Sequence, residues 1–136
     1  MTEQKSFVTS GKRKTSIAKA TLRPGKGIIR INSQLLDTIG NDFTRMKLKE
    51  PMMLAEPLSN KVNISIKVKG GGFQSQTEAS RLAIAKALLN YSNNSMELKK
   101  KFLDYDRHLL VADVRRKEMC KPNDSKARAK RQKSYR

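Results

Sequence analysis

The last twelve residues combine dense positive charge with almost no apolar surface, a pattern suited to binding phosphates. Six of them are Lys or Arg and none is Asp or Glu: Lys126, Arg128, Lys130, Arg131, Lys133 and Arg136. Such a segment cannot offset the entropy cost of folding alone, and its like charges repel one another. A phosphate backbone would neutralise them, because each cation that displaces a counterion adds to binding. The sequence therefore predicts an extended basic C-terminal tail, residues 121–136, that binds nucleic acid.

A second cationic cluster comprises Gly11, Lys12, Arg13 and Lys14, just ahead of a β-like stretch. A Walker-type phosphate loop is excluded, because Arg13 stands where that motif needs Ser or Thr and no helix follows. We interpret the cluster as a phosphate contact in which Gly11 lets the backbone approach the phosphate closely. The alternative is a solvated turn.

A glycine run, Gly70, Gly71 and Gly72, follows Lys67 and Lys69. Successive glycines let backbone amides line an anion, and the start of a following helix adds positive potential. Such a run is at least as often a plain connector between a strand and a helix. The two lysines on one face of the strand favour a contact with an RNA backbone.

The stretch from Asp104 to His108 holds two acids, a phenol and the only histidine, a set that could perform general acid/base chemistry. Carboxylates beside Arg107 and the lysine run 99–101 more often form surface ion pairs or helix-end contacts. No nucleophile has an identifiable base. We therefore expect no enzymatic activity.

Composition sets the class of protein. Thirty Lys and Arg against twelve Asp and Glu give a net charge of +18 on 136 residues, which indicates a strongly anionic partner. The length fits one globular RNA-binding domain, residues 1–120, followed by the tail. No apolar run approaches the roughly 18 residues that span a bilayer, and one Cys with one His cannot build a zinc site. We expect a cytoplasmic protein with no membrane or small-molecule partner, no cofactor and no metal.

The strands that would position these residues follow from period-two patterns. Two β-like stretches, residues 16–23 and 28–32, flank Pro24-Gly25-Lys26-Gly27, which predicts a hairpin. Apolar residues alternate with polar ones over residues 62–68, the clearest half-buried strand in the chain.

Helices follow from period-3.6 patterns and capping residues. The capping-box spacing from Ser75 to Glu78 predicts a helix from about Gln76 to Asn90, packed on the sheet. Weaker helical patterns cover residues 34–39, 43–54 and, after a Ser95 cap, 96–102.

Three blocks in this order resemble the universal small-subunit ribosomal protein number nine family: residues 11–18 with 24–27, residues 70–73 with 81–88, and the ending Ser134-Tyr135-Arg136. The resemblance covers nearly the whole chain. The Leu103 to Asp106 block and the last five residues are similar to the archaeal and eukaryotic branch, and we identify an archaeal-type member.

The resemblance implies an α+β fold, a two-layer α/β sandwich with a left-handed βαβ crossover. It also implies a body bound to small-subunit ribosomal RNA in the head, beside neighbouring head proteins, and a tail that reaches peptidyl-site tRNA. The tRNA contacts would be Lys133, Ser134, Tyr135 and Arg136. The ribosomal-RNA contacts would be Gly11, Lys12, Arg13, Lys14, Lys67, Lys69, Gly70, Gly71, Gly72, Arg115, Arg116, Lys126, Arg128, Lys130 and Arg131. Val114, where relatives usually have proline, and the lack of glycines in 120–125 leave the path into the tail open.

Two other functions remain. A free-standing nucleic-acid chaperone or chromatin-like protein would explain the charge and the tail but not the three ordered blocks. An RNA-processing enzyme that uses the Asp104 to His108 cluster is the third possibility.

Overall fold

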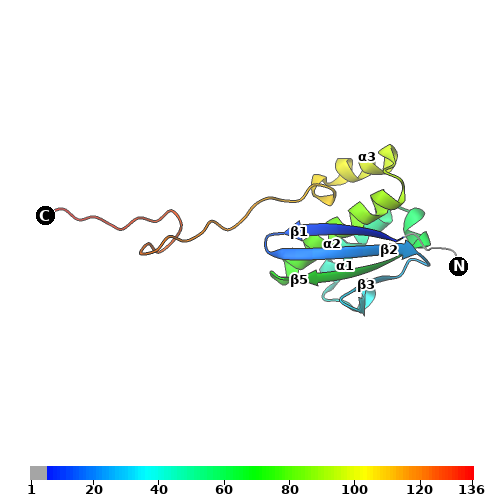
Figure 1. Cartoon of the computed structure of the whole chain (residues 1–136), viewed down its shortest axis with the longest axis horizontal. Coiled ribbons are helices and arrows are strands. Elements are labelled where there is room, and N and C mark those ends of the chain that lie inside the picture. Colours follow the sequence, from blue (N-terminus) through cyan, green and yellow to red (C-terminus); the bar gives the residue numbers. More distant parts are fainter. Residues whose placement is uncertain (1–5) are drawn as a thin grey trace.

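The computed structural model describes residues 6–136. Its body is a five-stranded sheet with helices on one face (Figure 1). The strands are β1 (Phe7–Arg13), β2 (Ser16–Pro24), β3 (Ile29–Ile31), β4 (Gln34–Leu35) and β5 (Val62–Lys69). The helices are α1 (Asp42–Leu54), α2 (Phe73–Tyr91) and α3 (Met96–Tyr105), with short 3-10 turns at Leu36–Thr38, Leu58–Lys61 and Arg107–Leu109. The expected α+β class is confirmed.

The strand order β1-β2-β5-β3-β4 shows that the predicted hairpin between residues 16–23 and 28–32 is wrong. Both strands exist, but β5 lies between them, antiparallel to β2 and parallel to β3. The connection is bonded to the start of β5 instead: Gly25 N–H donates to the Lys61 carbonyl at 2.9 Å. The actual hairpin joins β2 to β1, a strand that the sequence analysis did not predict.

Alternation in the central strands builds the core. In β5, Val62, Ile64 and Ile66 are buried while the residues between them point away from the core, so the strand predicted at 62–68 is confirmed. In β2, Ala18, Ala20 and Leu22 take the buried positions. Small inward side chains let α2 pack closely on the sheet.

The helix predictions hold in part. Helix α2 forms, but it begins at Phe73 rather than Gln76, and Gly72 is its N-cap without a side-chain bond. The capping box is therefore wrong, because Ser75 already lies inside the first turn. Helix α1 matches residues 43–54, and α3 continues past residue 102 to Tyr105.

Two of the weaker predictions differ from the structure: the helix at residues 34–39 and the side-chain cap at Ser95. Residues 34–39 form β4 and a 3-10 turn rather than a helix, because Gln34 and Leu35 pair with β3. Ser95 occupies the N-cap position of α3, but its side chain makes no capping bond.

The C-terminal segment has a different character from the body. From Ala112 to Arg136 it contains no helix or strand, and it runs away from the sheet (Figure 1). It leaves the body at the end of the sheet where β1 turns into β2.

Candidate nucleic-acid interface

Three of the predicted cations meet at one end of the sheet. Lys12 and Lys69 are exposed at the ends of β1 and β5. Both pair in register with Ile17 of β2, so the two lysines lie on either side of Ile17 on the same face of the sheet. Lys14 is exposed in the β1–β2 turn, with φ of 50°. We call these lysines and the glycine loop 70–72 the turn surface.

The glycine loop is held tightly against the start of β2. The Gly70 carbonyl accepts hydrogen bonds from Ser16 Oγ at 2.8 Å and from Gln76 Nε2 at 3.1 Å. Gly71 has φ of 67°, and a Cβ there would lie 2.1 Å from Ser16 Oγ. The loop therefore brings the start of α2, whose first turn contains no acid, to the same end of the molecule as the lysines.

Gly11 serves packing, which corrects the expectation that its backbone is open to a phosphate. It is buried within β1, and a Cβ there would lie 2.0 Å from the Ala79 carbonyl oxygen and 2.9 Å from Ala83 N. Only glycine lets α2 approach the strand this closely. The Gly11 backbone faces a helix rather than solvent.

Arg13 is also engaged within the protein. Its Nε lies 2.6 Å from Glu78 Oε2 in α2, and its Nη1 lies 3.2 Å from Asp113 Oδ2. The side chain is only 13% exposed. Arg13 thus ties β1 to α2 and to the start of the C-terminal segment.

The start of that segment is fixed to the turn surface. Asp113 accepts hydrogen bonds from the Arg115 side chain, with Oδ2 at 2.6 Å from Nη2, and from the Arg115 backbone N–H at 2.9 Å. These bonds, helped by the charge of Arg13 and opposed by burial, hold the pKa of Asp113 far below its usual range. Arg116 donates to the Lys14 carbonyl. Arg115 and Arg116 therefore lie next to the turn surface.

The tail cations are exposed to solvent. Arg128 pairs with Glu118 at 2.8 Å, and Arg131 donates to the Asn123 carbonyl at 3.3 Å. The remaining cations of the last twelve residues form no ion pair with any residue in 6–136: Lys126, Lys130, Lys133 and Arg136. Their charge is available to an anionic partner. Ser134 and Tyr135, between the last two of these cations, are exposed as well.

A further set of cations lies on the sheet face opposite the helices, which we call the open sheet face. Lys19 and Arg23 of β2 point there, as do Lys67 of β5 and Arg30 of β3. Sequence reasoning selected only Lys67 of these four. The signal for the β2 pair was present, because they alternate with buried apolar residues in 18–22.

The Asp104 to His108 cluster has a structural role at Asp106. Asp106 Oδ2 accepts a hydrogen bond from Arg81 Nη1 at 2.7 Å, and Oδ1 accepts one from the His108 N–H at 2.9 Å. Burial acts to raise the pKa of Asp106, but these hydrogen bonds outweigh it and lower the pKa. Arg81 also pairs with Glu50 of α1. The interpretation as ion pairs and helix-end contacts is confirmed for Asp106.

The described part of the chain contains neither a helix that could cross a membrane nor a group of side chains that could hold a metal ion. No helix within residues 6–136 has the length and apolarity needed to cross a membrane. No group of three His, Cys, Asp or Glu side chains in the same range is arranged to hold a metal ion.

Comparison with known proteins identifies the family. Residues 11–136 match the family described as ribosomal protein S9/S16. The small ribosomal subunit protein uS9 of Methanococcus maripaludis strain C7 is 53% identical over 131 residues, which cover 94% of this chain and 96% of the relative. The protein of the same name from strain C5 is 50% identical over 130 residues, with the same coverage. Both relatives are archaeal, in agreement with the predicted archaeal type, and the chain belongs to the ribosomal protein S9/S16 family.

Proposed function

We propose that this protein is a structural component of the small ribosomal subunit in the cytoplasm. In this proposal its body binds ribosomal RNA in the head, beside neighbouring head proteins, and its tail contacts peptidyl-site tRNA. Family membership and the names of the relatives support the assignment to the subunit. The family consists of structural ribosomal proteins, so the prediction that the chain is not an enzyme is confirmed.

The same proposal includes the handedness of the βαβ crossover and the division of the chain into a domain and a tail. Strands β3 and β5 are parallel and are connected through α1, as a βαβ unit requires. We infer the left-handed sense of this crossover from the family resemblance. The division into an RNA-binding domain, residues 1–120, and an extended basic tail, residues 121–136, is inferred from the length of the chain and from the dense charge and scarce apolar residues of its end.

The observation that carries the RNA-binding proposal is the attachment of the C-terminal segment, ahead of the tail, to the turn surface. Arg116 donates to the Lys14 carbonyl, so the cations of the turn surface continue directly into those of the tail. Lys12 and Lys69 stand on the same end of the sheet. A continuous strip of exposed cations suits an extended polyanion, because each neutralised phosphate releases counterions. Gly11 and Arg13 shape this strip through packing and ion pairs.

The tRNA part of the proposal rests on the end of the chain. Arg136 and Lys133 are exposed and have no ion-pair partner among residues 6–136. A guanidinium can hold a phosphate through two parallel hydrogen bonds, which is more directional than a lysine contact. The last residues are therefore suited to a defined phosphate geometry such as that of a tRNA stem.

Sedimentation through sucrose gradients tests the assignment to the subunit. Tagged protein expressed at its natural level should co-sediment stoichiometrically with small subunits and remain there through a moderate salt wash. A predominantly free or DNA-bound pool would instead favour a nucleic-acid chaperone or chromatin-like protein.

A further inference from the structure

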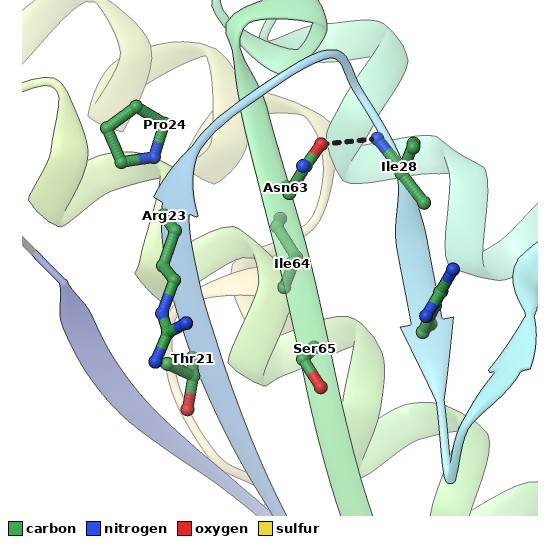
Figure 2. A pocket seen from close by; sticks show the side chains of 8 residues that line it. Thr21, Arg23, Pro24, Ile28, Asn63, Ile64 and Ser65 are labelled. Atoms are coloured by element: carbon green, nitrogen blue, oxygen red, sulfur yellow. Dashed lines mark hydrogen bonds between the residues drawn. The ribbon is translucent and has the colours of Figure 1, made fainter. Parts of the chain in front are cut away.

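The open sheet face contains a groove of about 670 Å³ (Figure 2). Strand β2 forms one wall with Thr21 and Arg23. Ile28, just before β3, and Arg30 of β3 form the other wall, and β5 forms the floor with Asn63 and Ser65. In register, Thr21 lies opposite Ser65, which in turn lies opposite Arg30.

The groove presents hydrogen-bond donors and no carboxylate. Two guanidinium groups and two hydroxyl groups line it. Asn63 adds an amide whose orientation is fixed, because its Oδ1 accepts the N–H groups of Lys26 at 2.9 Å and Ile28 at 3.0 Å. Figure 2 shows this oxygen directed at Ile28. The Nδ2 group donates no hydrogen bond to a residue within 6–136, so it remains available in the groove. Such a set of groups is complementary to an anion.

The charges around the groove are not balanced within the sheet. Lys19 lies directly opposite Lys67 in the antiparallel pair of β2 and β5, an arrangement of like charges that destabilises a sheet. None of the five strands contains Asp or Glu. An external anion bound on this face would relieve the repulsion.

The distribution of the cations indicates an elongated anion rather than a single small one. Cations occur along β2 and β5 from the register position of Lys69 to that of Arg23. That stretch of strand is about 20 Å long at roughly 3.3 Å per residue. The outward side chains of β2, β3 and β5 include no aromatic ring, so this face offers no platform for stacked bases.

We propose that the open sheet face is a second RNA-binding surface, on which a ribose–phosphate backbone lies along β5 with one phosphate in the groove between Arg23 and Arg30. The bases are not read there. The choice of RNA rests on the proposed function. An acidic segment of a neighbouring protein is the competing occupant.

A charge-matched pair of variants tests the groove. The probe is protein-free small-subunit ribosomal RNA, and the measurement is the slope of log affinity against log salt concentration for the full-length protein. Arg23→Gln/Arg30→Gln should make this slope shallower by about one unit, because the two side chains hold one phosphate between them. The control Lys99→Gln/Lys100→Gln removes the same charge from exposed positions on α3. Equal changes in the two double variants would overturn the groove assignment.

A reversal of charge on the floor gives a second test. Ser65 is exposed at the centre of β5, so Ser65→Asp and Ser65→Asn should fold alike, as circular dichroism would verify. The aspartate should weaken RNA binding at least tenfold relative to the asparagine. Equal affinities of these two variants would contradict a phosphate at this position.

Cross-linking in assembled small subunits identifies the occupant. A photoreactive p-benzoylphenylalanine replaces Ser65 in one sample and Lys14, on the turn surface, in a control sample. Cross-links to RNA from position 65 support the proposal, and cross-links to protein overturn it. RNA cross-links from position 14 alone would overturn the groove assignment while leaving the proposed function intact. A lack of RNA cross-links from both positions would count against the proposed function as well.

Discussion

Arg13 of β1 and Asp113 at the start of the C-terminal segment form an ion pair, with Nη1 3.2 Å from Oδ2. The pair joins the first strand to residues that follow the last helical turn. Together with the bond from Arg116 to the Lys14 carbonyl, the pair sets the direction in which the segment leaves the body.

This attachment should persist at low pH. The pKa of Asp113 is lowered in the folded protein, chiefly by hydrogen bonds from Arg115, so the stabilisation is present above the unfolded pKa of about 3.9 and is lost only as pH falls through the lower folded value. The carboxyl carbon-13 shift of Asp113 should therefore remain that of the ionised form from pH 8 down to about pH 4. A titration midpoint near 3.9 would show that these bonds do not persist in solution. Asp113→Asn, as a comparison, should speed amide exchange at Arg115.

Alanine substitutions at Gly11 and Gly72 should differ in their effect on stability, because only Gly11 is closely packed against other atoms. Gly11→Ala places a methyl group 2.0 Å from the Ala79 carbonyl oxygen, so it should lower the free energy of unfolding by about 1–3 kcal/mol, as expected for overpacking. Gly72→Ala is the matched control, because nothing lies within 4 Å of its Cβ position and its φ is −99°. It should change the free energy by less than about 0.5 kcal/mol. Urea denaturation measures both, and equal losses would contradict the close packing of β1 on α2.

Replacement of Arg13 should have a different effect from replacement of its neighbours Lys12 and Lys14. Lys12→Ala/Lys14→Ala should leave the unfolding midpoint unchanged, because both side chains are exposed, and should make the salt dependence of RNA binding shallower by about two units. Arg13→Ala should instead destabilise the protein by about 2 kcal/mol, since it removes a charged hydrogen bond to Glu78 that is partly buried. Denaturation and binding assays on the same samples distinguish the two effects. A stable Arg13→Ala protein with weakened binding would show that Arg13 faces the RNA.

Local sequence patterns are enough to predict an element whose apolar periodicity lies within that element. The strand predicted at 62–68 and the helix predicted from about Gln76 to Asn90 correspond to β5 and α2, because apolar periodicity is local to each element; the start of α2 at Phe73 was not predicted. The pairing of β2 with β5 was not, because it is decided by contacts between residues far apart in the chain. Strand β1 was missed because Gly11 interrupts its pattern, and the reason for that glycine lies in α2.

The residues of the candidate interface also fall into two groups: those that the sequence alone identifies and those that only the fold identifies. The cations of the tail were evident from composition alone, since no fold is needed to place them. Alternation marks Lys19 and Arg23 as outward-facing, but only the pairing of β5 with both β2 and β3 shows that they share one face with Arg30. Arg13 has the same chemical type as its neighbours in the sequence, and only the fold shows that Glu78 and Asp113 engage it.

The end of the tail allows a test that separates charge from geometry. Deletion of Lys133 to Arg136 removes no buried residue, so the body should fold and the subunit should assemble as in the wild type. Dissociation of tRNA from the peptidyl site of purified small subunits should nevertheless become faster, because two unpaired cations are lost. Addition of a few neutral residues after Arg136 should also speed dissociation, since the added chain would crowd the tRNA stem while leaving every cation in place. A tail that acted only through its charge would be insensitive to the extension. Wild-type dissociation rates in both variants would refute the tRNA contact and leave the ribosomal-RNA proposal to stand on the turn surface.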